Sequence, residues 1–162
     1  MEDITIEPAG TDEVTAVTEM WVELAAGQRE HGSHILPETN RTAIRETITR
    51  HVVGDSLLVA RSDRLVGFVM FTVETGTFEQ GCARGVVENL YVAPERRDGG
   101  IGTALLEAAE AALWDQDVDA VTLEVMATNR QAREFYVQRG YRPHRIELEK
   151  PPESDTHTKD DQ

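Results

Sequence analysis

Four stretches of the chain repeat apolar residues three and four positions apart, which is the spacing of one helix face. They cover residues 11–27, 38–51, 100–116 and 129–139. Thr11 or Asp12 can cap the first of these helices and Asn129 the last, and Gly140 follows the last one where a helix end favours glycine. The pattern therefore predicts four helices.

Shorter runs between the helices are rich in apolar and β-branched residues, which predict strands. These runs cover residues 4–6, 56–60, 65–75, 85–92, part of 118–126, and 141–149. The tight turn at Ser62–Arg64 joins two of them in a hairpin. Because a helical crossover joins parallel strands, the strands on either side of the 100–116 helix should pair in parallel. We therefore expect a mixed α/β (α+β) fold, a sheet covered by helices.

The length suits one compact domain, which we assign to residues 1–150 of 162. Residues 151–162 are polar and lack an apolar anchor, which predicts a disordered acidic tail. No apolar run reaches the roughly 18 residues of a membrane helix, and the first residues form neither a basic nor an apolar leader. We expect a cytoplasmic protein that does not enter a membrane.

Charge and cysteine content narrow the classes of function. The formal net charge of −14 repels the phosphate backbone of nucleic acids and argues against a nucleic-acid-binding protein. Cys82 is the only cysteine, so an intramolecular disulfide and a four-cysteine zinc site are excluded, and no metal site is predicted. Since no base lies near Cys82 in the sequence, a loop or core role fits it better than a catalytic thiol.

The acidic composition is accompanied by a scarcity of lysine. Lys150 and Lys159 are the only lysines among 16 basic residues. Such a balance resembles that of proteins from salt-loaded cytoplasm, where screening weakens self-repulsion, so a halophilic source is one hypothesis. An ordinary acidic bacterial protein is the alternative, and stability measured against molar salt separates the two.

Residues 86–102 predict a strand, a glycine-rich turn and the start of a helix. The glycines are Gly99, Gly100 and Gly102. They leave backbone N–H groups uncovered, and the first turn of a helix adds unpaired donors and a partial positive charge. Together with Arg96 and Arg97, these groups form a candidate site for a phosphate or diphosphate, although a Gly-Gly pair alone can also be a structural turn.

Two nucleotide-binding patterns fit this turn poorly. A Walker loop needs a Gly-Lys pair, which the chain lacks. A dinucleotide-binding turn needs a third glycine, but Leu105 stands at that position after Gly100 and Gly102. A mononucleotide-binding protein is accordingly a minor alternative, which thermal-shift titration with ATP and acetyl-CoA would separate.

The whole stretch resembles the GNAT superfamily of N-acetyltransferases. Arg97-x-x-Gly100-x-Gly102 is similar to the Arg/Gln-x-x-Gly-x-Gly/Ala signature of that family, and residues 88–94 also look like it. Asn129-x-x-Ala132-x-x-Phe135-Tyr136-x-x-x-Gly140-Tyr141 resembles the second family motif. The resemblance covers residues 85–141 and is weak over residues 1–76. It implies a GNAT-like, mostly antiparallel sheet with one parallel, splayed strand pair, flanked by helices.

The resemblance implies acetyl-CoA as the cofactor and indicates where it binds. Backbone N–H groups of the turn would hold its diphosphate, and the exposed strand edge would pair with the pantetheine arm opposite residues 120–126. The implied cofactor-binding residues are Leu90, Val92, Arg97, Asp98, Gly99, Gly100, Ile101, Gly102 and Asn129. Asp98 departs from the Gly or Arg frequent in the family, and we expect its carboxylate to face solvent. Asn129 can equally be a plain helix cap.

The resemblance also implies the chemistry. Tyr136 would protonate the departing thiolate, with ring packing in the core as the alternative. The acceptor amine must lose a proton, and Glu88 is the first candidate base, because simple strand alternation places it on the same face as Leu90. Glu124 is the second candidate.

The loop residues His31 and His34 are further candidates near an acceptor pocket. Glu88 can also be a solvated or structural residue, and a surface-loop role suits both histidines.

We expect direct transfer, with the amine attacking the thioester carbonyl while a backbone N–H near Leu90 polarises its oxygen. The acceptor would be a small-molecule or peptide amine, and its identity cannot be read from the sequence. A non-catalytic acyl-CoA-binding regulatory domain on the same fold is the alternative function. Homodimers are common in the family, so a homodimer is a further expectation.

Overall fold

The computed structural model describes residues 3–75 and 78–152. They fall into two compact units, Met1–Arg130 and Gln131–Gln162, and each is described by itself. Most of the tail predicted for residues 151–162 lies outside the described residues. No helix among the residues described is both long enough and apolar enough to cross a membrane.

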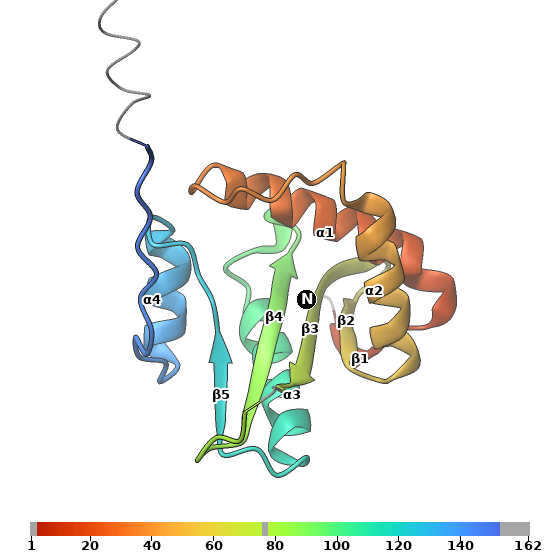
Figure 1. Ribbon diagram of the computed structural model, residues 1–162. Coiled ribbons are helices and arrows are strands. Elements are labelled where there is room, and N and C mark those ends of the chain that lie inside the picture. The colour runs from red at the N-terminus through yellow and green to blue at the C-terminus, as the bar shows by residue number, and fades with distance from the viewer. Residues whose placement is uncertain (1–2, 76–77, 153–162) are drawn as a thin grey trace, which may run out of the picture. The chain divides into compact units, whose positions relative to one another are not determined.

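The first unit is built on a five-stranded sheet whose spatial order follows the chain (Figure 1). The strands are β1 (Thr5–Pro8), β2 (Leu57–Arg61), β3 (Leu65–Val73), β4 (Arg84–Val92) and β5 (Ala120–Leu123). The pairs β1–β2, β2–β3 and β3–β4 are antiparallel, whereas β4 and β5 are parallel. The predicted mixed sheet and its parallel pair are therefore confirmed.

Helices cover both faces of this sheet (Figure 1). The short 3-10 turn η1 (Thr11–Glu13), α1 (Val14–Arg29) and α2 (Arg41–Val53) precede β2, and α3 (Ile101–Trp114) connects β4 to β5. Buried residues of α1 and α2 form one apolar cluster with the side chains of β2, β3 and β4 that face them. The members from those strands are Leu57, Val59, Phe68, Met70 and Tyr91.

Two strand glycines lie where a side chain would crowd the neighbouring atoms. A Cβ atom on Gly85 would lie 2.8 Å from Cδ2 of Leu113. A Cβ atom on Gly67 would lie 2.6 Å from the carbonyl oxygen of Tyr91 and 3.1 Å from Leu105. The absence of side chains at these positions leaves room for Leu105 and Leu113 of α3 against the sheet.

The second unit contains most of α4 (Arg130–Gln138), which ends in the predicted glycine cap. Gly140 has a φ of +97°, and its N–H bonds to the carbonyl of Val137 at 3.1 Å. The N–H of Tyr141 reaches the carbonyl of Tyr136, also at 3.1 Å. This pair of bonds is the Schellman arrangement, in which a left-handed residue closes the helix.

The strand predicted for residues 141–149 is absent, and this prediction was wrong. Residues 141–150 have no regular structure, and Ile146 and Leu148 are 77% and 90% exposed. Alternating apolar residues predict a strand only where a neighbouring strand takes up the backbone hydrogen bonds and one face becomes buried. Pro143 also lacks a donor for such a ladder, and the described part of the second unit holds no strand to pair with it.

Candidate functional site

The parallel strands β4 and β5 separate halfway along β4. Their pairing runs from Arg84 opposite Ala120 to Val87 opposite Leu123, where β5 ends. The strand β4 continues through Glu88–Val92 beside β3. The prediction of a splayed strand pair is therefore confirmed, and it leaves one edge of residues 88–92 without a β5 partner.

The hydrogen-bond pattern shows which backbone groups lie along this edge. Ala93 donates its N–H to the carbonyl of Val66 at 2.8 Å, and Tyr91 lies opposite Phe68. Residues along an antiparallel strand alternate between bonding the partner and turning away from it. Leu90 and Val92 therefore turn their N–H and C=O groups away from β3, toward the edge that β5 has left.

The glycine-rich turn follows directly on this edge. After the short 3-10 helix η2 (Pro94–Arg96), residues 97–100 are exposed and α3 begins at Ile101. Gly100 has a φ of +89°, and its carbonyl accepts the bond from Ala104 at 3.0 Å that opens the helical ladder. The N–H groups of Ile101 and Gly102 thus belong to the first turn of a helix, where the dipole favours an anion.

Each remaining residue of the turn has a definite place. The N–H of Arg97 bonds back to Pro94 across a long 3.4 Å, and the Ile101 side chain is buried. Asp98 is exposed and has a φ of +66°, a left-handed conformation that a short polar side chain tolerates. That Asp98 faces solvent when the cofactor is bound stays a prediction.

The Arg97 side chain folds back along β4 rather than extending from the turn. Its Nε donates a hydrogen bond to the carbonyl oxygen of Val92 at 2.8 Å. The guanidinium carbon also lies 5.8 Å from the centre of the Tyr91 ring. The arginine therefore connects the turn to the open edge of β4. Its hydrogen bond satisfies the Val92 carbonyl, which has no partner on β5.

Glu88 lies on a β-bulge at the point where β4 and β5 separate, which we call the fork. Met70 lies opposite Asn89 and Phe71 opposite Val87, so Glu88 has no opposite residue on β3. It also follows the last residue of β4 that pairs with β5. A bulge of this kind redirects a side chain and bends the strand.

The Glu88 carboxylate meets the ring of His51 from the end of α2. Nε2 of His51 lies 3.2 Å from Oε1 of Glu88, and Nδ1 lies 2.7 Å from Oγ of Ser56. Glu88 therefore points to the face covered by α2. Leu90 lies opposite Val69, on the other face from Met70. The predicted shared face of Glu88 and Leu90 is wrong, because the bulge breaks the alternation.

The other predicted candidates lie in the loops that follow α1 and β5. Glu124 is exposed directly after β5, and His34 is exposed in the loop after α1. The backbone of His31 is held by a hydrogen bond, because Oγ1 of Thr128 donates to its carbonyl oxygen at 2.9 Å. Asn129 precedes α4 and donates its backbone N–H to Met126 at 2.9 Å.

Tyr136 lies in α4, within the second unit, where aromatic rings surround it. Its ring centre is 5.2 Å from that of Phe135 and 5.8 Å from that of Tyr141, both edge to face. Arg139 stacks over Phe135 at 3.9 Å. Burial raises the pKa of the Tyr136 phenol to about 12, so its hydroxyl stays protonated at neutral pH.

A model of the acetyltransferase (GNAT) family matches residues 18–141. The chain belongs to this family. An uncharacterized N-acetyltransferase of Methanocaldococcus jannaschii is 33% identical over 84 residues, which are 51% of this chain and 49% of that protein. The chain spans about half the length of the curated relatives it matches.

Solved structures share the GNAT fold along nearly the whole chain. A GCN5-related N-acetyltransferase from Ralstonia eutropha has a TM-score of 0.73 at 23% identity, covering 93% of this chain and 99% of that one. The PaiA N-acetyltransferase from Thermoplasma acidophilum, solved in complex with coenzyme A, has a TM-score of 0.72 at 20% identity. The match covers 90% of this chain and 93% of the PaiA chain. At these identities the likeness shows the fold alone.

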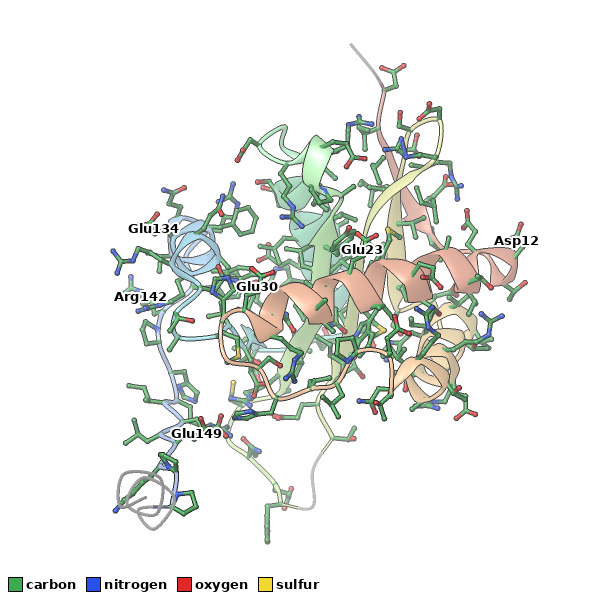
Figure 2. All side chains as sticks on the ribbon, turned by 90° about the horizontal axis from the view of Figure 1, so that it is seen from above. Asp12, Glu23, Glu30, Glu134, Arg142 and Glu149 are labelled. Carbon is green, nitrogen blue, oxygen red and sulfur yellow. The ribbon has the colours of Figure 1, made fainter. Side chains whose placement is uncertain are left out.

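Within this GNAT fold, three features of the site escaped sequence reasoning. The sequence pattern places His51 only at the end of a helix and Ser56 only at the start of a strand, because the contact with Glu88 joins segments over 30 residues apart. Tyr91 donates its hydroxyl to the carboxylate of Glu23, which projects from α1 toward β4 (Figure 2). Burial and this bond raise the pKa of Tyr91. The bond fastens α1 to the open half of β4.

Proposed function

We propose that the chain is an acetyl-CoA-dependent N-acetyltransferase that moves an acetyl group to a primary amine by direct attack. The single observation that carries this is the fork: β4 runs past the end of β5 and leads into the exposed turn at residues 97–100. A backbone edge followed by a helix N-terminus offers hydrogen bonds to an extended amide-bearing arm and to a diphosphate in sequence.

The residues present fit acetyl-CoA. Leu90 and Val92 would hold its pantetheine arm, the N–H groups of residues 97–102 its diphosphate, and Asn129 would contact the arm further along. Because Arg97 already bonds the Val92 carbonyl, Leu90 would supply most of the strand's pairing. When bound, acetyl-CoA supplies an activated thioester. A backbone N–H near Leu90 would polarise its carbonyl oxygen.

Glu88 would act as the general base. A lysine-like ammonium with a pKa near 10.4 costs about 4–5 kcal/mol to deprotonate at pH 7. Glu88 is partly exposed at the point where the strands part, with a side chain 37% accessible, so a carboxylate oxygen can reach a proton in the fork. Its bond to His51 restrains the carboxylate before the amine arrives.

Tyr136 would donate to the departing thiolate. Its raised pKa of about 12 keeps the hydroxyl protonated. Full proton transfer to a thiolate near pKa 8.5 would be uphill by about 5 kcal/mol. We therefore assign Tyr136 a hydrogen bond to the sulfur as negative charge develops there, with the proton following only as the product leaves.

The net negative charge of the protein favours one charge class of acceptor. A net charge of −14 attracts cationic amines and lowers the local concentration of anionic ones. An ammonium on a small molecule or peptide is thus the favoured acceptor class, and a cytoplasmic location, where acetyl-CoA is made and used, fits the proposal.

The test is a panel of amines with acetyl-CoA, read by thiol release and by mass of the acetylated product. Thiol release that requires an amine and falls in the Glu88→Gln variant supports the proposal. Saturable binding of acetyl-CoA without transfer to any amine would instead support a regulatory acyl-CoA-binding domain. Glu107→Gln on the α3 surface is a matched control for Glu88→Gln and should leave the rate unchanged.

A further inference from the structure

We propose that a pocket between α1 and α2 binds an apolar tail of the acceptor, so that the preferred acceptor is a primary monoamine with an alkyl or aryl tail rather than a diamine. The inference rests on the proposed function and names the acceptor class. We call this site the α1–α2 pocket. It is lined by six described residues from α1, α2 and the loop between them: Trp21, Ile35, Asn40, Ala43, Ile44 and Thr47.

The α1–α2 pocket has the size of a single ring or a short alkyl chain. It encloses about 260 Å³. An apolar cavity of roughly 150 Å³ is already large enough to bind a benzene ring. Trp21 is 7% exposed and Ile44 is partly buried, and both pack in the apolar cluster under the two helices. The wall of the pocket is therefore mostly apolar carbon.

The pocket lies on the row of α2 side chains that ends at the fork. Asn40, Ile44 and Thr47 follow one another at intervals of four and three residues. His51 comes four residues after Thr47, and such intervals place side chains on one helix face. Nε2 of His51 lies 3.2 Å from Oε1 of Glu88. A tail in the pocket and an ammonium at Glu88 would therefore be one to two helical turns apart, about 5–10 Å.

The two polar residues of the lining already have hydrogen-bond partners. Nδ2 of Asn40 donates to the carbonyl oxygen of Leu36 at 2.8 Å. Oγ1 of Thr47 accepts a bond from Nη2 of Arg50 at 3.2 Å. None of the described residues that line the pocket carries a charge. The pocket therefore offers apolar surface, with the positive charge of Arg50 beside Thr47.

This lining disfavours a second ammonium on the acceptor. An ammonium entering the pocket would lose hydration and find no carboxylate of the lining to replace it. It would also approach the like charge of Arg50. A methyl or phenyl group at the same place only removes apolar surface from water, which is favourable. The net charge of −14 attracts cations to the protein as a whole, but the pocket selects a neutral, apolar end.

Ile35 lines the pocket from a loop whose backbone is held in place. Nη1 of Arg29 donates to the Ile35 carbonyl oxygen at 3.2 Å, and the Ile35 N–H donates to Oγ of Ser33 at 3.3 Å. Leu36 is the next residue and is not part of the lining. The two side chains are 49% and 50% exposed. Ile35 and Leu36 therefore provide a variant and a matched control in the same loop.

The experiment compares hexylamine with hexamethylenediamine, which has the same chain but ends in a second ammonium. With saturating acetyl-CoA, kcat/KM should be about 10-fold higher for hexylamine, because the diamine keeps its last two methylenes in water. From butylamine to hexylamine, kcat/KM should rise about 3- to 4-fold per methylene. Equal values for monoamine and diamine, or no rise with chain length, would overturn the inference and leave the acetyltransferase proposal standing.

Ile35→Asp places a carboxylate in the pocket and should weaken the preference. We expect kcat/KM to fall about 5-fold for hexylamine, which loses an apolar contact, and to rise about 2-fold for the diamine, which gains an exposed ion pair. Leu36→Asp adds the same charge outside the lining and should change the ratio of the two values by less than about 2-fold. Equal changes in both variants would show that loop charge sets the preference, and would overturn the inference.

A second variant reduces the volume of the pocket without adding a charge. Ala43 is exposed on α2, so Ala43→Phe should leave the fold intact and occupy part of the cavity. It should lower kcat/KM for hexylamine about 5-fold and for butylamine by less than about 2-fold, because only the longer chain reaches far into the pocket. A variant that lowers both values equally would contradict the assignment of the tail to this site.

A binding measurement tests the pocket without turnover. Hexylamine added to wild type with coenzyme A should shift the amide NMR signals of Ala43 and Thr47, and Ile35→Asp should reduce these shifts. Shifts confined to other parts of the protein would overturn the inference. Wild type that binds acetyl-CoA and shows the shifts but acetylates no amine would instead fail the proposed function, with the apolar pocket retained.

Discussion

The Nε atom of Arg97 donates a hydrogen bond to the carbonyl oxygen of Val92, five residues earlier, at 2.8 Å. This bond crosses from the glycine-rich turn to the edge that β5 leaves open. The same guanidinium lies over Tyr91, whose hydroxyl is bonded to Glu23 of α1. One arginine therefore links the turn, the open strand and, through Tyr91, the helix above them.

Arg97→Ala should raise the KM for acetyl-CoA about 10-fold while changing kcat by less than about 3-fold. A hydrogen bond from a charged donor contributes about 1.5 kcal/mol or more, which corresponds to a factor of about 10. Steady-state kinetics at fixed amine measures it. Arg96→Ala removes the same charge one residue earlier, and an equal effect of the two variants would show that charge alone, rather than the bond to Val92, matters.

Gly100→Ala should destabilise the protein by about 1–2 kcal/mol, because the residue has a φ of +89°. A Cβ there meets nothing within 4 Å, so the loss is backbone strain rather than a clash. For a chain of this size, that corresponds to a fall in Tm of about 3–6 °C by calorimetry. Gly99→Ala is the control, since its φ is not left-handed and its Cβ would contact Arg96 at an ordinary 3.7 Å. Matching Tm values for the two variants would contradict the prediction.

Tyr136→Phe should lower kcat about 10-fold or more with little change in the KM of acetyl-CoA, because Phe keeps the ring contacts and loses the hydroxyl. Since burial raises the Tyr136 pKa to about 12, ionisation of this phenol should not reduce wild-type kcat between pH 8 and about 10. Tyr141→Phe serves as the control. Unaltered turnover in Tyr136→Phe would end its assignment as a donor.

Glu13→Gln should destabilise the protein at neutral pH but not in acid. The side-chain hydrogen bond from Arg61 holds the Glu13 pKa below its usual value, and Gly10 N–H adds a second bond at 2.9 Å. A lowered folded-state pKa stabilises the protein above the unfolded value, near 4.3, and that stabilisation is lost as pH falls through the folded value.

Thermal melts between pH 3 and 7 measure this effect. We expect a difference of about 1 kcal/mol, or about 3 °C, at pH 7, which shrinks below pH 4. Glu46→Gln on the exposed side of α2 should show no such dependence. A Glu13→Gln difference that is constant from pH 3 to 7 would rule out the charged bond to Arg61 as its cause.

Much of the fold follows from local pattern. The strands and helices from β1 to α4 appear where periodicity places them, with ends moved by a few residues: α1 runs past Gly27 to Arg29, and β5 stops at Leu123. A glycine inside a helix costs only about 1 kcal/mol, so α1 can continue past Gly27. The segment 141–149 fails because a strand needs a partner that its own residues do not provide.

Some features of the candidate site likewise follow from local sequence, and others only from strand pairing. The turn at residues 97–102 and the edge at Leu90 and Val92 were predictable, because glycine spacing and strand order are local properties of the chain. The orientation of Glu88 was not, since the bulge beside it arises from the pairing of β3 with β4. A one-residue slip in register reverses the face of a side chain.

The sequence by itself determined the family, the order of helices and strands, and the exposed glycine turn, because each depends on residues close together in the chain. Only the tertiary structure decided that His51 and Ser56 meet Glu88, that Arg97 bonds Val92, and that residues 141–149 form no strand. Those outcomes depend on which segments become neighbours when the sheet assembles. The contacts that result are stabilised by burial and hydrogen bonding across the fold rather than by the preferences of any one segment.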